Sequence, residues 1–165
     1  MPRPNYSRFR LNWVLVNELA IGPAPRAEHH LDHLQDAGVR AVLSLCDTNE
    51  AEPPLSLQQR FICRRLVLPD HRINRSLELN ELHSALKLLK SLQPEGPVFA
   101  HCVAAMERSP LVCMAWLVEH KSLSPTDALE YLMQVHPGTN PLPQQLSVLR
   151  ELQFAQYRSE DQLAA

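Results

Sequence analysis

The apolar residues of this chain fall into short runs of strand length, separated by longer stretches of helical periodicity. A nearly continuous apolar run over 39–46 is typical of a buried strand in a parallel sheet, and 61–68 is predicted to be the next strand. A third run, 98–100, has the same character, and two short segments at 12–16 and 19–23 predict a hairpin-like entry to the sheet. The pattern thus predicts several strands that are mostly separated by helices.

Helices are predicted over 27–37, 76–92, 108–120, 124–135 and 144–157. Gly38 is the expected C-cap of the first, and Ser76 the expected N-cap of the second, with Glu78 in its first turn. Ser124 is the expected N-cap of the fourth. The stretch 108–120 is apolar on almost every face, which indicates a buried central helix. Together these elements predict an α/β domain with a central, mostly parallel sheet flanked by helices on both faces.

The chain has no repeats and no linker-like segment, so we expect a single domain. Its 165 residues and 45% hydrophobic composition suit a single compact core. We expect an N-terminal extension over 1–11, the domain over 12–157 and a frayed C-terminal tail over 158–165.

Charge and hydropathy narrow the possible partners. A formal net charge of −2 and a pI near 6.4 argue against a nucleic-acid partner or an anionic membrane surface. The basic start of the chain precedes no long apolar segment, and no run approaches the roughly 20 apolar residues of a membrane span. We therefore expect a soluble, cytoplasmic monomer. Its expected partner is its substrate, with neither a nucleic acid nor a membrane.

The cysteines and histidines give no metal-site pattern. The cysteines, which are Cys46, Cys63, Cys102 and Cys113, form no Cys-x-x-Cys pair and are expected to be free thiols. His29, His30 and His33 share a predicted helix face, but no further ligand completes a coordination shell. We expect a solvated helix face there, and neither a metal nor a cofactor in the protein.

The segment 96–110 carries the chemistry. An apolar strand runs into His101-Cys102, five residues follow, and Arg108-Ser109 begins an apolar helix. A loop that closes onto a helix N-terminus points backbone N–H groups at one spot, where they bind phosphate. Arg108 can add a bidentate guanidinium fork, and a cysteine in such a field is held as the nucleophilic thiolate. The arrangement predicts capture and transfer of a phosphoryl group.

This motif resembles the signature of the cysteine-dependent protein tyrosine phosphatases, in particular the small dual-specificity branch, and the resemblance covers roughly residues 12–153. It implies that Cys102 forms a phosphocysteine and that Arg108 holds the phosphoryl oxygens. It also implies that Ser109 hydrogen-bonds the sulfur and that His101 orders the loop. The loop positions expected to bind phosphate are Val103, Ala104, Ala105, Met106, Glu107 and Arg108.

The same resemblance implies an upstream aspartate as the general acid, and Asp70 fits that role. It ends an apolar strand and lies 32 residues before Cys102. The alternative is an ordinary turn aspartate after Pro69. Asp47 and Asp127 fit less well, because one ends an earlier strand and the other lies in a predicted helix cap.

The loop departs from the family pattern at one position, and a second residue, Glu107, bears on the charge of the site. The family usually has glycine three residues after the cysteine, where this chain has Ala105, and glycine there permits close backbone approach to the ligand. Glu107 puts a carboxylate near the mouth of the site, unless its side chain faces away. Both features disfavour a polyanionic substrate.

Cys46 invites a redox hypothesis. The segments 43–47 and 69–71 are similar to those of a tumour-suppressor phosphoinositide phosphatase, in which a cysteine at the place of Cys46 is a resolving thiol. That similarity implies a reversible disulfide between Cys46 and Cys102; the alternative is an ordinary core cysteine.

Three functions remain open from the sequence. The first is an active phosphatase on phosphotyrosine, with phosphoserine, phosphothreonine or a weakly charged non-protein monoester also open. The second is a non-catalytic phosphate-binding module. The third, a rhodanese-like sulfurtransferase or an arsenate reductase, fits least, because those reactions do not require Asp70 or the Arg108-Ser109 pair. Arg72 and Arg75 either contact an acidic substrate or are solvated.

Overall fold

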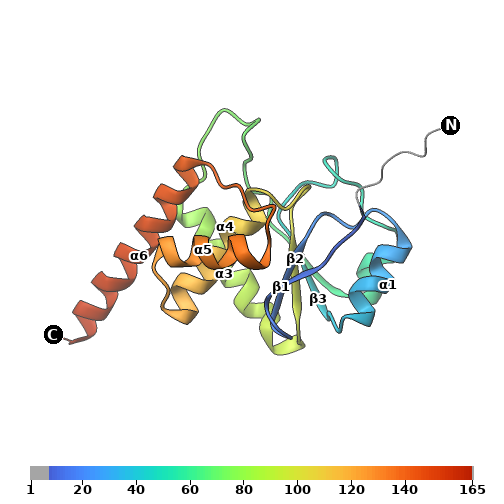
Figure 1. The fold of residues 1–165 in the computed structure, drawn as a ribbon, viewed down its shortest axis with the longest axis horizontal. Coiled ribbons are helices and arrows are strands. Elements are labelled where there is room, and N and C mark those ends of the chain that lie inside the picture. The colour runs from blue at the N-terminus through green and yellow to red at the C-terminus, as the bar shows by residue number, and fades with distance from the viewer. Residues whose placement is uncertain (1–7, 165) are drawn as a thin grey trace.

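The computed structural model describes residues 8–164 and consists of a five-stranded mixed sheet with helices on both faces (Figure 1). The strands are β1 (Asn12–Leu15), β2 (Leu19–Gly22), β3 (Ala41–Ser44), β4 (Ile62–Arg65) and β5 (Val98–His101). The helices are α1 (Glu28–Asp36), α2 (Leu57–Arg60), α3 (Leu79–Leu92), the 3-10 helix η1 (Gln93–Glu95), α4 (Arg108–Lys121), α5 (Pro125–Val135) and α6 (Pro143–Ala164).

The strand order is β1-β2-β5-β3-β4, with β1 antiparallel to β2 and all other pairs parallel. This confirms the predicted mostly parallel sheet. β5 therefore lies in the middle, and the segments after β3, β4 and β5 leave the sheet at the same edge. In parallel sheets that edge is where ligand-binding loops collect.

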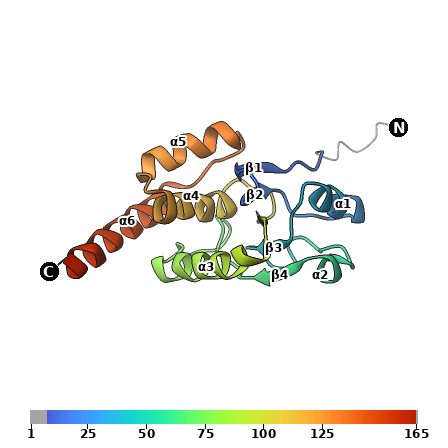
Figure 2. The ribbon, with the colours of Figure 1, turned by 90° about the horizontal axis from the view of Figure 1, so that it is seen from below.

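Alternating strand residues divide the core between the two faces of the sheet. Ile21, Leu43 and Ala100 belong to the larger cluster, which is completed by side chains of α3 to α6. Ala20 and Phe99 belong to the smaller cluster, beneath α1 and α2. Figure 2 shows the two groups of helices on opposite sides of the sheet.

α4 is the central helix, as predicted. Every residue from Arg108 to Val118 is buried, because α4 packs against the sheet, α3, α5 and α6. A helix that is apolar all round and covered on all sides cannot shift without opening the core. Its N-terminus is consequently a fixed point in the molecule.

Two predicted helix ends are wrong. α3 begins at Leu79 with Glu78 as its N-cap, not at Ser76. The Glu81 carboxylate reaches back to the Glu78 N–H at 3.1 Å, and Leu77 and Leu82 are both buried, which together form a capping box and a hydrophobic staple. α6 continues beyond Tyr157 to Ala164, because no proline or glycine follows to end it.

The ends of the chain are described only in part. Most of the expected extension over 1–11 lies outside the described residues, as does Ala165, but Phe9 is within them and is buried. The Phe9 ring stacks on His30 with 4.4 Å between centroids, so the end of the extension belongs to the core. Within residues 8–164, no helix is long and apolar enough to cross a membrane.

Candidate active site

Cys102 lies directly after the central strand β5, at the start of a loop over 102–107 that we call the phosphate loop. Its side chain is buried, with only 3% of the residue exposed. Its sulfur is 3.2 Å from the hydroxyl oxygen of Ser109, in the first turn of α4. Strand, loop and helix thus hold the thiol and the hydroxyl together, as the motif predicts.

The phosphate loop turns its carbonyl groups toward the protein. The Val103 carbonyl accepts from the Ala24 N–H at 3.0 Å, and the Met106 carbonyl accepts from the Asn140 N–H at 2.8 Å. In contrast, no backbone N–H from Val103 to Arg108 has an acceptor among the described residues. A run of unpaired N–H groups at a helix N-terminus forms a site for an anion.

Ala105 holds the most constrained backbone position of the loop. Its φ is 56°, in the left-handed region that favours glycine, and the residue is fully buried. The His136 ring fixes this conformation, because its Nε2 donates to the Ala105 carbonyl at 2.7 Å. The other ring nitrogen, Nδ1, accepts from the Asn12 side-chain amide at 2.8 Å. Alanine therefore adopts the backbone conformation for which the family uses glycine.

Arg108 is buried and is held by a carboxylate that the sequence analysis missed. Its Nη1 and Nη2 donate to the two carboxylate oxygens of Glu50, at 3.1 and 3.0 Å. Nη1 also donates to the Leu68 carbonyl at 3.2 Å. Among residues 8–164, the edge formed by Nε and Nη2 has no further hydrogen-bond acceptor. The guanidinium is thus anchored at one end and offers its other edge to a bidentate oxyanion.

The charges of Glu50 and Arg108 stabilise each other. Burial disfavours both charged forms, but the hydrogen bonds and nearby charges together outweigh it. Arg108 and the Asp47 backbone N–H lower the pKa of Glu50, and Glu50 with the charges of Cys102 and Asp70 raises the pKa of Arg108. One signal could have found Glu50 from the sequence. A buried arginine needs a carboxylate partner, and Glu50 follows the end of a predicted buried strand.

Asp70 is buried and lies just before the exposed segment 71–76 of what we call the acid loop, residues 69–77, the green arch at the top of Figure 1. Its carboxylate accepts from the Arg72 backbone N–H at 2.9 Å and from Arg72 Nε at 2.8 Å. It also lies 3.7 Å from Arg108 Nη2, which brings it to the predicted site. Burial opposes its ionisation, but the Arg72 hydrogen bonds and the Arg108 charge lower the pKa of Asp70.

Arg72 joins the acid loop to Glu50. Its Nη2 donates to a Glu50 oxygen at 2.7 Å, so Glu50 contacts both arginines. The Arg72 side chain is 60% exposed, whereas that of Arg108 is 4% exposed. Only Arg72 can therefore leave the cluster without opening the core. A second link joins the two loops, because the Glu107 carboxylate faces His71 Nδ1 at 3.0 Å.

His101 is buried beneath the loop and uncharged. Its Nδ1 donates to the Cys102 carbonyl at 2.9 Å, and its Nε2 accepts from the Ser44 hydroxyl at 2.7 Å. Burial lowers the pKa of His101 from 6.5 to about 4. The ring thus orders the start of the phosphate loop through neutral hydrogen bonds.

The other cysteines are free thiols. Burial raises the pKa of Cys46 and of Cys113, which disfavours their thiolates. Cys46 lies in the loop after β3, and a disulfide with Cys102 stays a prediction. In the described part of the chain, no three metal-ligating side chains lie together.

A cavity of about 600 Å³ opens above the thiol. Its lining residues are Asp70, His71, Arg72, Cys102, Val103, Ala104, Met106, Glu107, Arg108, Asn140 and Leu142. All the residues that the sequence predicts as catalytic line this cavity. Because its wall includes the thiol, the free loop amides and the acid, it can hold a phosphoryl group and part of the alcohol that carries it.

Comparison with known proteins points to one family. A family model described as the dual specificity phosphatase catalytic domain matches residues 19–154. Among curated proteins, phosphatidylglycerophosphate phosphatase PTPMT2 of Arabidopsis thaliana is 26% identical over 159 residues, covering 89% of this chain and 67% of the relative. Phosphatidylglycerophosphate phosphatase PTPMT1 of the same plant is 25% identical over 132 residues, covering 79% of this chain but only 39% of the relative. The rat dual specificity protein phosphatase 5 is 32% identical, over 38% of this chain and 16% of its own length.

Solved structures share the fold. A structure of PTPMT1 in complex with PI(5)P superposes with a TM-score of 0.74 and 22% identity, over 86% of this chain and 94% of that one. The human tyrosine phosphatase-like serine/threonine/tyrosine-interacting protein gives a TM-score of 0.77 and 22% identity, over 89% and 97% of the two chains. At this identity the likeness establishes the fold alone.

Proposed function

Because the chain belongs to the dual-specificity phosphatase catalytic-domain family, we propose that it hydrolyses phosphomonoesters through a phosphocysteine on Cys102. One observation carries this proposal. The buried Cys102 begins a loop whose N–H groups, from Val103 to Arg108, have no acceptor among the described residues. Oriented donors that already point at one spot stabilise a transferring phosphoryl group without reorganising.

In the first step the Cys102 thiolate attacks phosphorus and the P–O bond to the alcohol breaks. The loop amides and the free Nε–Nη2 edge of Arg108 hold the three equatorial oxygens. Asp70, protonated, gives its proton to the departing oxygen. Because Arg72 favours the ionised form of Asp70, it must loosen its hydrogen bonds when substrate binds.

In the second step the Asp70 carboxylate takes a proton from a water molecule, which attacks the phosphocysteine. The S–P bond breaks, and inorganic phosphate and the Cys102 thiolate are released. Ser109 can donate to the sulfur from 3.2 Å and so stabilises the thiolate as it leaves. The positive charge that the reaction needs comes from backbone N–H groups and Arg108.

For the substrate we propose a glycerol phosphate monoester carried by a phospholipid, in preference to a phosphoprotein. Two relatives that align with most of this chain are named phosphatidylglycerophosphate phosphatases, whereas the protein phosphatase relative aligns with 38% of it. The cavity lining also suits a phosphate ester with an apolar neighbour. Beyond Arg108 and Arg72 it has no basic side chain other than His71, and Met106 and Leu142 add apolar surface.

This substrate changes two expectations from the sequence. It favours the non-protein alternative over phosphotyrosine, and it requires the domain to work at a lipid surface, although the sequence predicts no membrane partner.

The test is release of inorganic phosphate from phosphatidylglycerophosphate in detergent micelles and from a phosphotyrosine peptide. It uses the wild type, Cys102→Ser and Asp70→Asn. We expect the lipid to react at least tenfold faster, Cys102→Ser to be inactive, and Asp70→Asn to lose roughly 10²–10⁴-fold in kcat.

Two results would count against the proposal in different ways. A faster reaction of the peptide would leave the phosphocysteine chemistry but remove the lipid substrate. An inactive wild type that still binds vanadate would make the domain a non-catalytic phosphate-binding module.

A further inference from the structure

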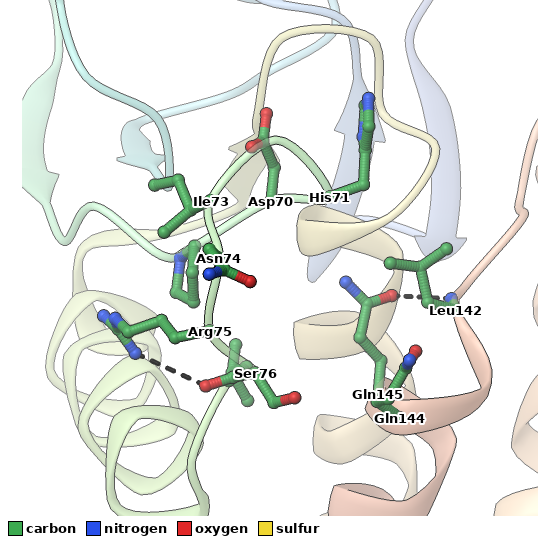
Figure 3. Close-up of a pocket in the computed structure, with 11 residues that line it drawn as sticks. Asp70, His71, Ile73, Asn74, Arg75, Ser76, Leu142, Gln144 and Gln145 are labelled. Carbon is green, nitrogen blue, oxygen red and sulfur yellow. Dashed lines mark hydrogen bonds between the residues drawn. The ribbon is translucent and has the colours of Figure 1, made fainter.

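A second cavity, of about 410 Å³, lies between the acid loop and the start of α6 (Figure 3). Its lining residues are Pro69, Asp70, His71, Ile73, Asn74, Arg75, Ser76, Leu77, Leu142, Gln144 and Gln145. It shares Asp70, His71 and Leu142 with the cavity above Cys102. The two cavities therefore meet beside the general acid.

The polar groups of this second cavity are mostly uncharged. Its one arginine, Arg75, is paired with Glu81 through two hydrogen bonds of 2.6 and 2.9 Å. In Figure 3 the Arg75 side chain points away from Gln145. Apart from the groups at its border with the catalytic cavity, amides and a hydroxyl remain to contact a ligand, contributed by Asn74, Ser76, Gln144 and Gln145.

Gln145 is the best-defined donor in this cavity. Only 4% of the residue is exposed, and its Oε1 accepts from the Leu142 N–H at 2.8 Å. A backbone N–H requires an oxygen acceptor, so this contact fixes which end of the amide faces Leu142. The Nε2 donor is left on the cavity side, without an acceptor in the described part of the chain (Figure 3).

A donor of fixed orientation that faces a cavity, without a protein partner, can bind a ligand oxygen. Nε2 is not fully enclosed, so water can reach it in the free protein. A bound molecule that displaces this water without supplying an oxygen would leave the donor unpaired, at a cost of about 1–3 kcal/mol, so a ligand with an oxygen at that place is favoured. Asp70, the proposed proton donor to the leaving oxygen, lines both cavities, so the leaving group can extend from the catalytic cavity into this one.

We propose that this second cavity binds the hydroxyl-bearing part of the leaving group, with Gln145 Nε2 donating to one of its oxygens. The ligand class is a neutral polyol, such as the glycerol next to the phosphate. This inference rests on the proposed function, because it assigns the leaving group of the same reaction. It predicts that polyol phosphates are preferred over aryl phosphates, whose flat ring offers no oxygen there.

The test compares kcat/KM for glycerol 3-phosphate with kcat/KM for 4-nitrophenyl phosphate. Gln145→Glu keeps the oxygen that accepts from Leu142 and removes the donor, whereas Gln145→Met removes both. We expect the ratio of the two kcat/KM values to fall about tenfold in both variants. Gln153→Met, on the same helix outside the cavity, should leave the ratio within twofold of the wild type.

An equal loss on both esters would overturn the subsite, because it would assign Gln145 a role common to all substrates. An unchanged ratio would overturn it as well. Repeating the comparison with micellar phosphatidylglycerophosphate distinguishes the two sources of the polyol. A fall in its rate relative to the aryl ester assigns the cavity to a lipid head group, and a fall for glycerol 3-phosphate alone assigns it to a free polyol phosphate.

A binding measurement keeps this inference separate from the proposed function. In Cys102→Ser, calorimetry with glycerol 3-phosphate and with inorganic phosphate needs no turnover. We expect glycerol 3-phosphate to bind about tenfold more tightly, and the added Gln145→Met to remove the difference. Equal affinities in Cys102→Ser would overturn the subsite even if the domain is an active phosphatase. A clear difference would uphold it even if the domain is inactive.

Discussion

The phosphate loop and the acid loop face the same cavity but are held by different forces. Hydrogen bonds of backbone carbonyls and of the His101 and His136 rings hold the phosphate loop between the buried strand β5 and the buried helix α4. The acid loop is exposed over 71–76, and the ion pairs of Arg72 and Arg75 and the contact between His71 and Glu107 hold it. Neutral buried contacts respond little to salt, whereas exposed ion pairs are screened. The loop that we propose binds phosphate is thus rigid, and the loop that carries the proposed proton donor is adjustable.

Glu50 joins the two loops, so its removal should have the largest effect. Glu50→Ala leaves Arg108 buried without its carboxylate, which we expect to lower the free energy of unfolding by about 3 kcal/mol. It also frees the guanidinium to turn, and kcat/KM should fall roughly 10²-fold. Urea unfolding and aryl phosphate hydrolysis measure the two effects.

The matched control is Glu52→Ala, two residues away and exposed. If Glu52→Ala and Glu50→Ala lose equal activity, the ion pair with Arg108 does not position the guanidinium.

His101 tests whether the phosphate loop depends on an uncharged anchor. Its pKa of about 4 in the fold lies below the 6.5 of an unfolded chain, so the unfolded state binds the proton first as pH falls. The contribution of His101 to the free energy of unfolding is therefore complete above about pH 7 and is lost as the pH falls from about 6.5 to about 4. Between pH 7 and pH 5 the free energy of unfolding should fall by about 2 kcal/mol.

Urea unfolding at the two pH values checks this prediction. We expect the difference to shrink in His101→Gln and to persist in His83→Gln, which changes an exposed helix residue. The same pH dependence in His101→Gln as in the wild type would assign it to other groups.

Arg72→Met tests whether the acid loop is adjustable, and we expect it to change kcat/KM by a few fold at a given pH. The first step needs protonated Asp70, so kcat/KM falls as pH rises through the pKa of that carboxyl. Arg72 lowers this pKa, and Arg72→Met should therefore raise it and move the falling limb of the profile to higher pH.

The profile of kcat/KM against pH, for wild type and Arg72→Met, measures the shift. Added salt should move the wild-type limb in the same direction, because it screens the exposed arginine. Arg64→Met, which removes an exposed arginine of β4, is the control. A limb that stays in place would show that Arg72 does not hold Asp70 in solution.

The sequence predicts the parts of this site that are set by local structure. One strand–loop–helix unit carries His101, Cys102, Arg108 and Ser109 within nine positions of the sequence. Asp70 follows a strand of recognisable pattern. Glu50 contacts Arg108 across 58 positions of sequence, from an irregular loop with no periodicity to reveal it. Such contacts depend on how the strands are ordered in the sheet, which composition does not encode.

The start of α3 is a second case in which contacts outside the helix override the local preference of the sequence. Serine is a better N-cap than glutamate in isolation, so local preference selects Ser76. The capping box with Glu81 and the burial of Leu77 select Glu78 instead. A tertiary contact therefore decides between two locally acceptable helix starts.

Ala105→Gly should have the smallest effect, although it changes a buried residue of the phosphate loop. Glycine removes the left-handed strain of alanine, about 1–2 kcal/mol, but loses a buried methyl of about 0.8 kcal/mol and adds unfolded-state entropy of about 0.5–1 kcal/mol. These contributions nearly cancel, so the free energy of unfolding should stay within about 1 kcal/mol of the wild type. Because the His136 contact already holds the loop in this conformation, kcat/KM should rise less than threefold. A gain in kcat/KM above tenfold would show that alanine keeps the phosphate loop from its phosphate-binding conformation. The rigid conformation of this loop would then form only when glycine is present.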